Sequence, residues 1–294
     1  MNWEGVILTD SGGFQIFSLN AFRKITDDGV TFQSHLDGSK HHFTPEKIID
    51  IQRIIGSDIM MMLDVCPPGD ADKKTWINAL EQTTRWAIRS MKHYKATHPL
   101  YNHEQILLPI VQGGIDKELR LRSASELCAL EAEGYAIGGL AVGEKKSDML
   151  KTVEWMDEFL PKNKLRYLMG VGTPEDLVEC VSRGVDLFDC VMPTRNARNG
   201  QLFSFDGKIN IRNSKYKTDF SPIDENGFSP MSEEYSKAYL HHLFKTEEIL
   251  GYRIATQHNL RFYIFLMKTM QKEIEKNSFM PWAKKFLSRY LNKN

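Results

Sequence analysis

Six short apolar runs, separated by stretches with helical periodicity, constrain the fold of this 294-residue chain more than any other feature. The runs are residues 6–10, 59–64, 106–112, 135–140, 166–170 and 185–189. Helices are expected to begin at Thr44-Pro45 and Thr173-Pro174, where a hydroxyl can cap the helix and proline fits its first turn. Gly184 is expected to end the second of these helices. Repeated strand–helix units with near-continuous apolar strands predict a parallel sheet that is buried on both faces.

Polar residues and glycines recur where these predicted strands become loops. Asp10, Asp64, Gln112, Gly138-Gly139 and Asp189 occupy these positions. Such residues at the carboxyl ends of parallel strands are typical of the active-site face of a TIM (β/α)8-type barrel. A Rossmann fold is a weaker interpretation, because no GxGxxG motif follows a strand.

A closed barrel has eight strands, so we expect this chain to lack the first two, which would leave strand edges unpaired. Residues 203–211 predict a β-hairpin with an Asp206-Gly207 turn, and helices are expected at about 233–250, 258–276 and 280–292. The prediction is a single α/β domain over 1–294. It has six βα units in 1–200, followed by the hairpin and a helical C-terminal subdomain in 201–294.

Composition indicates an ordinary globular chain without a strong overall field. Basic and acidic residues both number 38, so attraction to a polyanion would need a local cluster. Residues 195–217 supply one, with six basic side chains and one acidic side chain. The four cysteines form no CxxC pair, and no apolar run reaches the roughly 18 residues of a membrane span. We therefore expect a reduced, cytoplasmic protein without a membrane partner.

Residues 186–200 (DLFDCVMPTRNARNG) carry the most suggestive chemistry. An apolar strand ends at Asp189, and an arginine-containing loop is expected to follow. A strand-end carboxylate often faces a ligand, and arginine binds phosphate groups well. This segment therefore suits a phosphate-bearing substrate.

Together with residues 9–15 (TDSGGFQ), 110–114 (IVQGG), 138–144 (GGLAVGE) and 167–172 (YLMGVG), this segment resembles the tRNA-guanine transglycosylases, the queuine/preQ1 family. The resemblance extends from about residue 5 to 265, with the motifs in family order. It implies a TIM barrel and a pentosyltransferase of queuosine biosynthesis. Such an enzyme exchanges guanine at the wobble position of certain tRNAs for the 7-deazaguanine base preQ1.

The resemblance implies that Asp189 is the catalytic nucleophile and Asp10 the general acid/base. Breaking an N-glycosidic bond builds positive charge on the ribose, and a carboxylate can trap that centre covalently, as in retaining glycosidases. Position alone leaves another interpretation open, in which each carboxylate caps the N-terminus of a helix.

The resemblance also implies a base-binding pocket. Asp64 would accept hydrogen bonds from the base, Gln112 and Gly139 would line the pocket, and the Leu140 carbonyl would lie near the preQ1 aminomethyl group. Phe14 and Met169 would sandwich the ring, although without the motifs both would be expected in the core. Cys66 and Val142 match the bacterial pattern. These last residues imply preQ1 rather than queuine.

Partners follow from the same resemblance. The macromolecular substrate would be a tRNA with a GUN anticodon, bound by Arg195 and Arg198. The basic stretch 195–217 adds Lys208 and Lys215 as candidate phosphate contacts. The small-molecule substrates would be guanine and preQ1, and the protein would be a homodimer.

Besides the expected lack of two barrel strands, the chain departs from the family pattern at two places. The positions of three zinc-binding cysteines hold Gly227, Ser229 and Ser232, and only His258 remains. Because glycine and serine are poor zinc ligands, we expect no metal and no other cofactor, with His258 starting a helix or packing in the core. Val65 stands where the family usually has glutamate, so the pocket has one carboxylate fewer.

Two other functional interpretations remain. The first is an inactive fragment or non-catalytic partner subunit of the same family, which the predicted absence of two strands favours. The second is a barrel glycosidase acting on a small nucleoside, which the basic stretch 195–217 disfavours.

Overall fold

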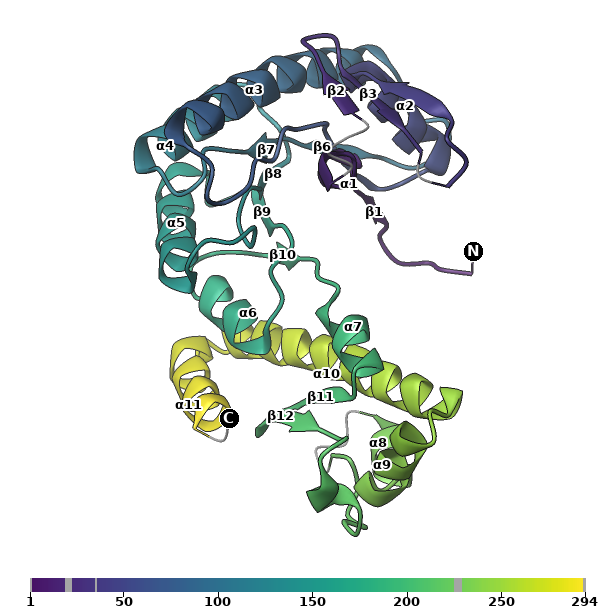
Figure 1. Cartoon of the computed structure of the whole chain (residues 1–294). Coiled ribbons are helices and arrows are strands. Elements are labelled where there is room, and N and C mark those ends of the chain that lie inside the picture. Colours follow the sequence, from purple (N-terminus) through teal and green to yellow (C-terminus); the bar gives the residue numbers. More distant parts are fainter. Residues whose placement is uncertain (1, 19–22, 35, 225–228, 293–294) are drawn as a thin grey trace. The chain divides into compact units, whose positions relative to one another are not determined.

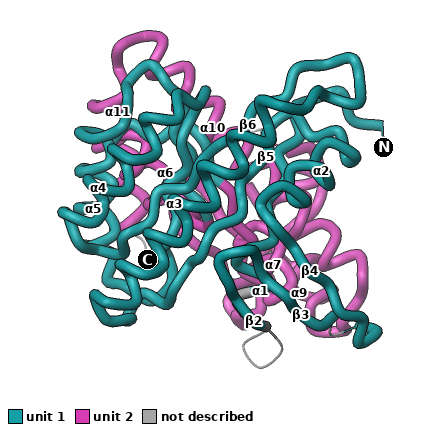
Figure 2. The backbone as a smooth tube through the Cα atoms, turned by 90° about the horizontal axis from the view of Figure 1, so that it is seen from above, with its two compact units in different colours: residues 1–169, 183–188 teal, residues 170–182, 189–294 magenta. Residues whose placement is uncertain are grey.

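The computed structural model of the protein describes residues 2–18, 23–34, 36–224 and 229–292 (Figure 1). The chain forms two compact units, coloured separately in Figure 2. Unit 1 contains residues 1–169 and 183–188, and unit 2 contains residues 170–182 and 189–294. The single domain predicted for 1–294 stays a prediction.

The six apolar runs all form strands in unit 1, and these strands pair in parallel. Their sheet orders are β1-β5-β6 and β10-β9-β8-β7. The strands are β1 (Leu8–Thr9), β5 (Ile59–Met61), β6 (Ile106–Leu108), β7 (Ile110–Val111), β8 (Gly134–Ile137), β9 (Leu165–Leu168) and β10 (Leu187–Phe188). The predicted third strand is divided into β6 and β7 by Pro109, which has no N–H to donate. The α/β class with parallel strands is confirmed.

Helices α2 to α5 follow one another around the strands of unit 1 (Figure 1). The helices of this unit are α1 (Gly13–Ser18), α2 (Pro45–Ile55), α3 (Lys73–Ala96), α4 (Lys117–Cys128) and α5 (Lys146–Phe159). The Thr44 hydroxyl accepts a hydrogen bond from the Lys47 N–H at 3.2 Å, which confirms the predicted helix start. Within the described residues, no helix is long and apolar enough to cross a membrane.

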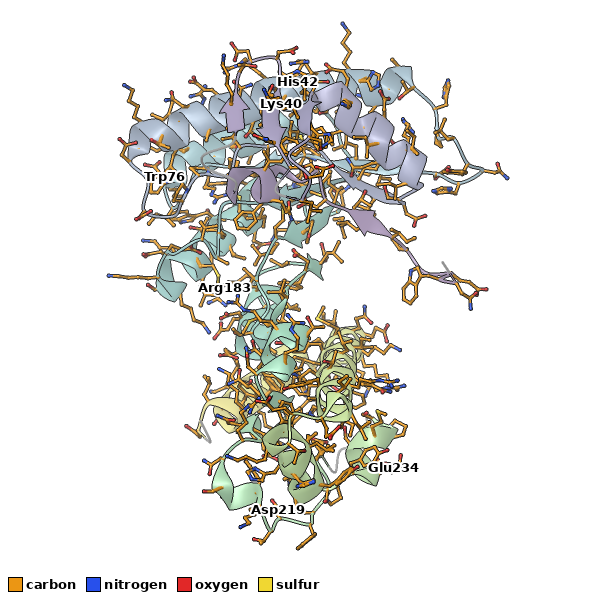
Figure 3. All side chains as sticks on the ribbon, turned by 45° about the vertical axis from the view of Figure 1, so that its right-hand side comes forward. Lys40, His42, Trp76, Arg183, Asp219 and Glu234 are labelled. Atoms are coloured by element: carbon orange, nitrogen blue, oxygen red, sulfur yellow. The ribbon has the colours of Figure 1, made fainter. Side chains whose placement is uncertain are left out.

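An antiparallel sheet in unit 1 was not predicted. It has the order β2-β3-β4 and consists of β2 (Arg23–Ile25), β3 (Val30–Gln33) and β4 (Lys40–Phe43). Lys40 and His42 of β4 are two residues apart and therefore share a face of this sheet (Figure 3). Val30 packs with Ile48 and Trp86 in a buried cluster that fixes the sheet against α2 and α3. The Asp28-Gly29 pair between two alternating segments was the signal in the sequence.

Unit 2 is built from helices and one hairpin. Its elements are α6 (Pro174–Val181), α7 (Met192–Arg198), β11 (Gln201–Ser204), β12 (Gly207–Asn210), a 3-10 turn (Ser214–Tyr216), α8 (Pro230–Glu234), α9 (Lys237–Lys245), α10 (Ile249–Glu275) and α11 (Phe279–Leu291). The Thr173 cap is confirmed, because its side chain accepts from the Asp176 N–H at 3.2 Å. Helix α6 ends at Val181, so Gly184, with a φ of 80°, lies beyond its C-cap Ser182 rather than forming it.

The hairpin is confirmed, but its turn lies one residue earlier than predicted. Ser204 pairs with Gly207, so the turn residues are Phe205 and Asp206. Gly207 begins β12 with a φ of 111°, a conformation that other residues rarely adopt. The prediction that Asp206 and Gly207 together form the turn is wrong.

The predicted helix boundaries after the hairpin also need correction. The stretch 233–250 is interrupted, because α8 ends at Glu234, α9 ends at Lys245 and α10 begins at Ile249. His258 therefore lies inside α10 rather than at a helix start. It is fully buried, so the alternative expectation of a packing histidine is confirmed.

Candidate active site

Three polar side chains of unit 1 meet at the carboxyl ends of its parallel strands. Asp10 directly follows β1, Asp64 lies just after β5, and Gln112 directly follows β7. The Gln112 Nε2 group donates to Asp64 Oδ2 at 2.7 Å. Asp10 is close enough for its charge to raise the pKa of Asp64. The structure thus brings together three of the predicted site residues.

The environment of Asp64 changes its acidity. Burial of the carboxyl group is the main cause and the nearby Asp10 charge the second, and together they raise the pKa of Asp64 to about 7. The hydrogen bond from Gln112 opposes this shift. A carboxyl group that titrates near neutral pH can accept hydrogen bonds when ionised and hold a proton when neutral.

Gln112 is held from several sides, and its side chain is 1% exposed. Its backbone N–H donates to the Ser123 hydroxyl at 3.1 Å. Its Oε1 atom has no hydrogen-bond partner in the described part of the chain. A Cβ atom at Gly139, where φ is 65°, would lie only 2.5 Å from this Oε1, so the site requires glycine there. Gln112 and Gly139 are therefore brought together, with an amide oxygen left for a ligand.

Leu140 and Cys66 are both buried in unit 1. Burial raises the pKa of the Cys66 thiol to about 12, and the charge of Asp64 adds to the effect. The thiol is therefore neutral, which suits a pocket wall rather than a nucleophile. Glu144 accepts from the backbone N–H groups of Ala141 at 2.5 Å and Val142 at 3.0 Å, and so shapes the loop after Leu140. Sequence reasoning gave Glu144 no role, although it ends the GGLAVGE motif.

Phe14 lies on α1 and is 54% exposed, so the interpretation of Phe14 as a core residue is wrong. Met169 follows β9 and is partly buried. An exposed aromatic ring next to the site can stack on a base. The predicted sandwich of a base between Phe14 and Met169 stays a prediction.

Asp189 belongs to unit 2, directly follows β10 and is exposed. Its Oδ1 atom accepts from the Gly170 N–H at 2.8 Å. The next helix, α7, has Val191 as its N-cap and no side-chain capping bond. Asp189 is thus not the N-cap residue of this helix, and both interpretations of this carboxylate stay open.

The expected arginine loop after Asp189 is largely the helix α7. Arg195 and Arg198 lie in its last turn and are exposed. Lys208 on β12 instead pairs with Glu175 at 3.2 Å, and the Lys215 ammonium lies 4.9 Å from the centroid of the Tyr216 ring. The four residues predicted to bind RNA therefore differ in how much of their charge is already neutralised.

The residues at the family's zinc positions are buried and hydrogen-bonded. His258 Nε2 lies 2.8 Å from the Phe203 carbonyl, which can only accept, so Nε2 carries the proton. Nδ1 then accepts from the Ser232 hydroxyl at 2.7 Å. Burial lowers the pKa of His258, so the ring is neutral with both nitrogens occupied. Ser229 is also buried, while Gly227 lies outside the described residues. This set of donors does not fit a zinc ion.

The chain is similar to known proteins over nearly its whole length. The family model described as queuine tRNA-ribosyltransferase matches residues 1–292. A queuine tRNA-ribosyltransferase of Caldanaerobacter subterraneus is 51% identical over 290 residues, covering 99% of this chain and 76% of the relative. Those of Dehalococcoides mccartyi and Halothermothrix orenii are 52% and 47% identical, and the matches cover 72% and 77% of their lengths. The chain therefore belongs to the queuine tRNA-ribosyltransferase family of glycosyltransferases.

Proposed function

We propose that this chain replaces guanine at the wobble position of tRNAs with a GUN anticodon by preQ1. The carrying observation is the Asp64–Gln112 pair, in which a half-buried carboxyl group with a pKa near 7 is held 2.7 Å from an amide nitrogen. Guanine and its 7-deaza analogue both present an N1–H and an exocyclic amine. An ionised Asp64 can accept from both, since charge-assisted hydrogen bonds of this kind are strong and selective.

The rest of the pocket would discriminate between bases. Gly139 and the amide oxygen of Gln112 would face the polar edge of the base, while Phe14 and Met169 would contact its two faces. The Leu140 carbonyl would accept from the preQ1 aminomethyl group. Cys66 and Val142 would leave room for this small substituent and none for the larger side chain of queuine.

The exchange would proceed by double displacement. An oxygen of Asp189 attacks C1′ of the ribose, and the bond between C1′ and N9 breaks with its electron pair on guanine, which takes up a proton. The deprotonated N9 of preQ1 then attacks C1′ and displaces Asp189. Asp10 is proposed to give and take these protons, since a carboxyl group in hydrogen-bond reach can act as acid and base in turn.

Arg195, Arg198, Lys208 and Lys215 are proposed to bind the phosphates of the anticodon loop, and the protein is proposed to act as a homodimer. We also propose that it uses no metal. The neutral, doubly hydrogen-bonded ring of His258 and the serines at positions 229 and 232 support this proposal.

A covalent trap tests the proposal. Incubation with guanine-34 tRNA should give a shifted band on a denaturing gel, and Asp189→Ala should abolish it. Asp186→Asn is a matched control, because Asp186 is also exposed and accepts one backbone N–H, from Arg166 at 2.9 Å. A band of equal strength in Asp189→Ala would refute the nucleophile. If the unaltered protein gives neither a band nor base exchange, the non-catalytic partner becomes the better interpretation.

A further inference from the structure

Arg120 is a buried cation that takes no part in the proposed chemistry. It lies in the first turn of α4 and is 0% exposed. Burial lowers its pKa to about 10, so the guanidinium is still charged at neutral pH. Within the described part of the chain, its side chain bonds to backbone carbonyls and to no carboxylate. The nearby Glu144 charge offsets only part of the effect of burial. A buried charge that is hydrogen-bonded to no carboxylate is costly, which calls for a reason.

The three carbonyls lie at the end of β7, in the loop that follows it and in the loop after β8, and these segments carry base-pocket residues. Nε donates to Gly114 at 2.7 Å and Nη1 to Val111 at 3.0 Å, which places bonds on both sides of Gln112. Nη2 donates to Gly139 at 3.4 Å, in the loop after β8. One rigid, planar group therefore ties both loops together, as only arginine among the cationic side chains can.

The surrounding glycines leave this geometry little freedom. A Cβ atom at Gly113 would lie 2.9 Å from the Arg120 backbone nitrogen, and one at Gly114 would lie 2.4 Å from the indole ring of Trp76. Gly113 and Gly114 both have positive φ angles, of 129° and 58°. The loop is thus pressed between α3 and α4, and the guanidinium provides hydrogen bonds to its carbonyls.

We infer that Arg120 is a positioning residue, which sets the distance between the Gln112 amide and the Gly139–Leu140 backbone and thereby the fit of the base. The inference rests on the proposed function, because it assigns the base to this pocket. It predicts a change in the affinity for the base and none in the affinity for tRNA, since the segments bonded to Arg120 contain none of the residues proposed to bind RNA.

The test is steady-state exchange of labelled guanine into tRNA by Arg120→Lys and Arg120→Met. Misplacing a binding group by a fraction of an ångström should raise KM for guanine about tenfold, with a smaller change in kcat and an unchanged KM for tRNA. Arg120→Lys keeps the charge and should lie between the unaltered protein and Arg120→Met.

Arg53 is the matched control. It is 3% exposed and also donates to backbone carbonyls, those of Tyr94 and Thr97, but these precede β6 at the amino ends of the strands. Arg53→Lys should lower the melting temperature as Arg120→Lys does and leave KM for guanine within about twofold, a change worth less than about 0.5 kcal/mol.

The results of these measurements distinguish failure of the inference from failure of the proposed function. An unchanged KM for guanine in Arg120→Lys, or an equal rise in Arg53→Lys, would overturn the inference. Should both Arg120 variants fail to fold, Ser123→Ala tests the same loop by removing the acceptor of the Gln112 N–H, and an unchanged KM there would also overturn it. A lack of exchange by the unaltered protein would instead refute the proposed function.

Discussion

At the scale of single residues, Asp64 has an acidity that depends on the folded state. Its pKa in the unfolded chain is near 4, whereas burial and Asp10 raise it to about 7 in the native protein. The native state therefore holds a proton that the unfolded state has already lost between these two pH values. Stability contributed by the neutral form is lost as pH rises through this window. Below pH 4 both states hold the proton, so this group no longer makes the free energy of unfolding depend on pH.

Asp64→Asn should remove this loss, because an amide does not ionise. The free energy of unfolding of the variant minus that of the unaltered protein should increase from about pH 4 to pH 7 and stay constant above. Urea denaturation at several pH values measures the difference. A difference that is independent of pH would show that Asp64 keeps an ordinary pKa.

His258 supplies the second prediction at this scale. Its proton lies on Nε2 toward the Phe203 carbonyl, and its other nitrogen accepts from Ser232, so no lone pair remains for a metal. Elemental analysis of dialysed protein should find much less than one zinc per chain, and EDTA should leave the melting temperature unchanged. A zinc ion that survives dialysis would point to other ligands.

At the scale of elements, Asn259 joins three parts of unit 2. From the middle of α10 its Nδ2 group donates to the carbonyls of Pro193 and Gln201, both at 2.9 Å, and its Oδ1 accepts from the Phe203 N–H at 3.1 Å. The side chain is fully buried. It therefore connects α10 to β11 and to α7, the helix that carries Arg195 and Arg198.

Asn259→Ala should destabilise the protein by about 3 kcal/mol, because three backbone groups, two of them in buried hydrogen bonds, lose their partners. Asn259→Asp should destabilise the protein less, because the Phe203 N–H keeps its acceptor. Both hydrogen bonds that the Asn259 amide donates would still be lost. Asn213→Ala, which removes an exposed cap of the 3-10 turn, should cost about 1 kcal/mol and serves as the control in urea denaturation. Equal costs for Asn259→Ala and Asn213→Ala would contradict this account of the junction.

At the scale of the whole molecule, the balance of 38 basic and 38 acidic residues leaves RNA affinity to local groups. Each phosphate contact should steepen the log–log dependence of tRNA affinity on salt by about 0.7 to 0.9. Arg195→Ala and Arg198→Ala should each flatten this slope by about that amount. Lys208→Ala should flatten it less, because Glu175 already neutralises part of its charge. Filter binding at several salt concentrations measures the slopes, and equal effects of Lys208 and the arginines would contradict the argument.

Local chemistry explains what could be predicted from the sequence. The six strands, the Thr44 and Thr173 caps and the positions of Asp10, Asp64, Gln112 and Asp189 at strand ends all follow from periodicity and from residues a few positions apart. The family motifs are also short contiguous stretches that can be recognised in the sequence, and the family membership they indicate is confirmed. The roles of the motif residues in the site stay proposals.

Other features depended on contacts between residues far apart in the chain, which local patterns do not encode. The antiparallel sheet β2-β3-β4 needs Ile48 and Trp86 to cover Val30. Ile254 and Ala255 of α10 pack in a buried cluster of unit 2 with residues far from them in the chain. The pKa of Asp64 depends on Asp10, 54 positions away, and on burial. In the sequence Arg120 has the pattern of an ordinary helix residue, and only the fold places three carbonyls around its guanidinium. The sequence by itself therefore determined the strands, the helix starts and the candidate chemistry, whereas only the tertiary structure decided acidity, burial and the partners of buried charges, because these depend on the surroundings that folding creates.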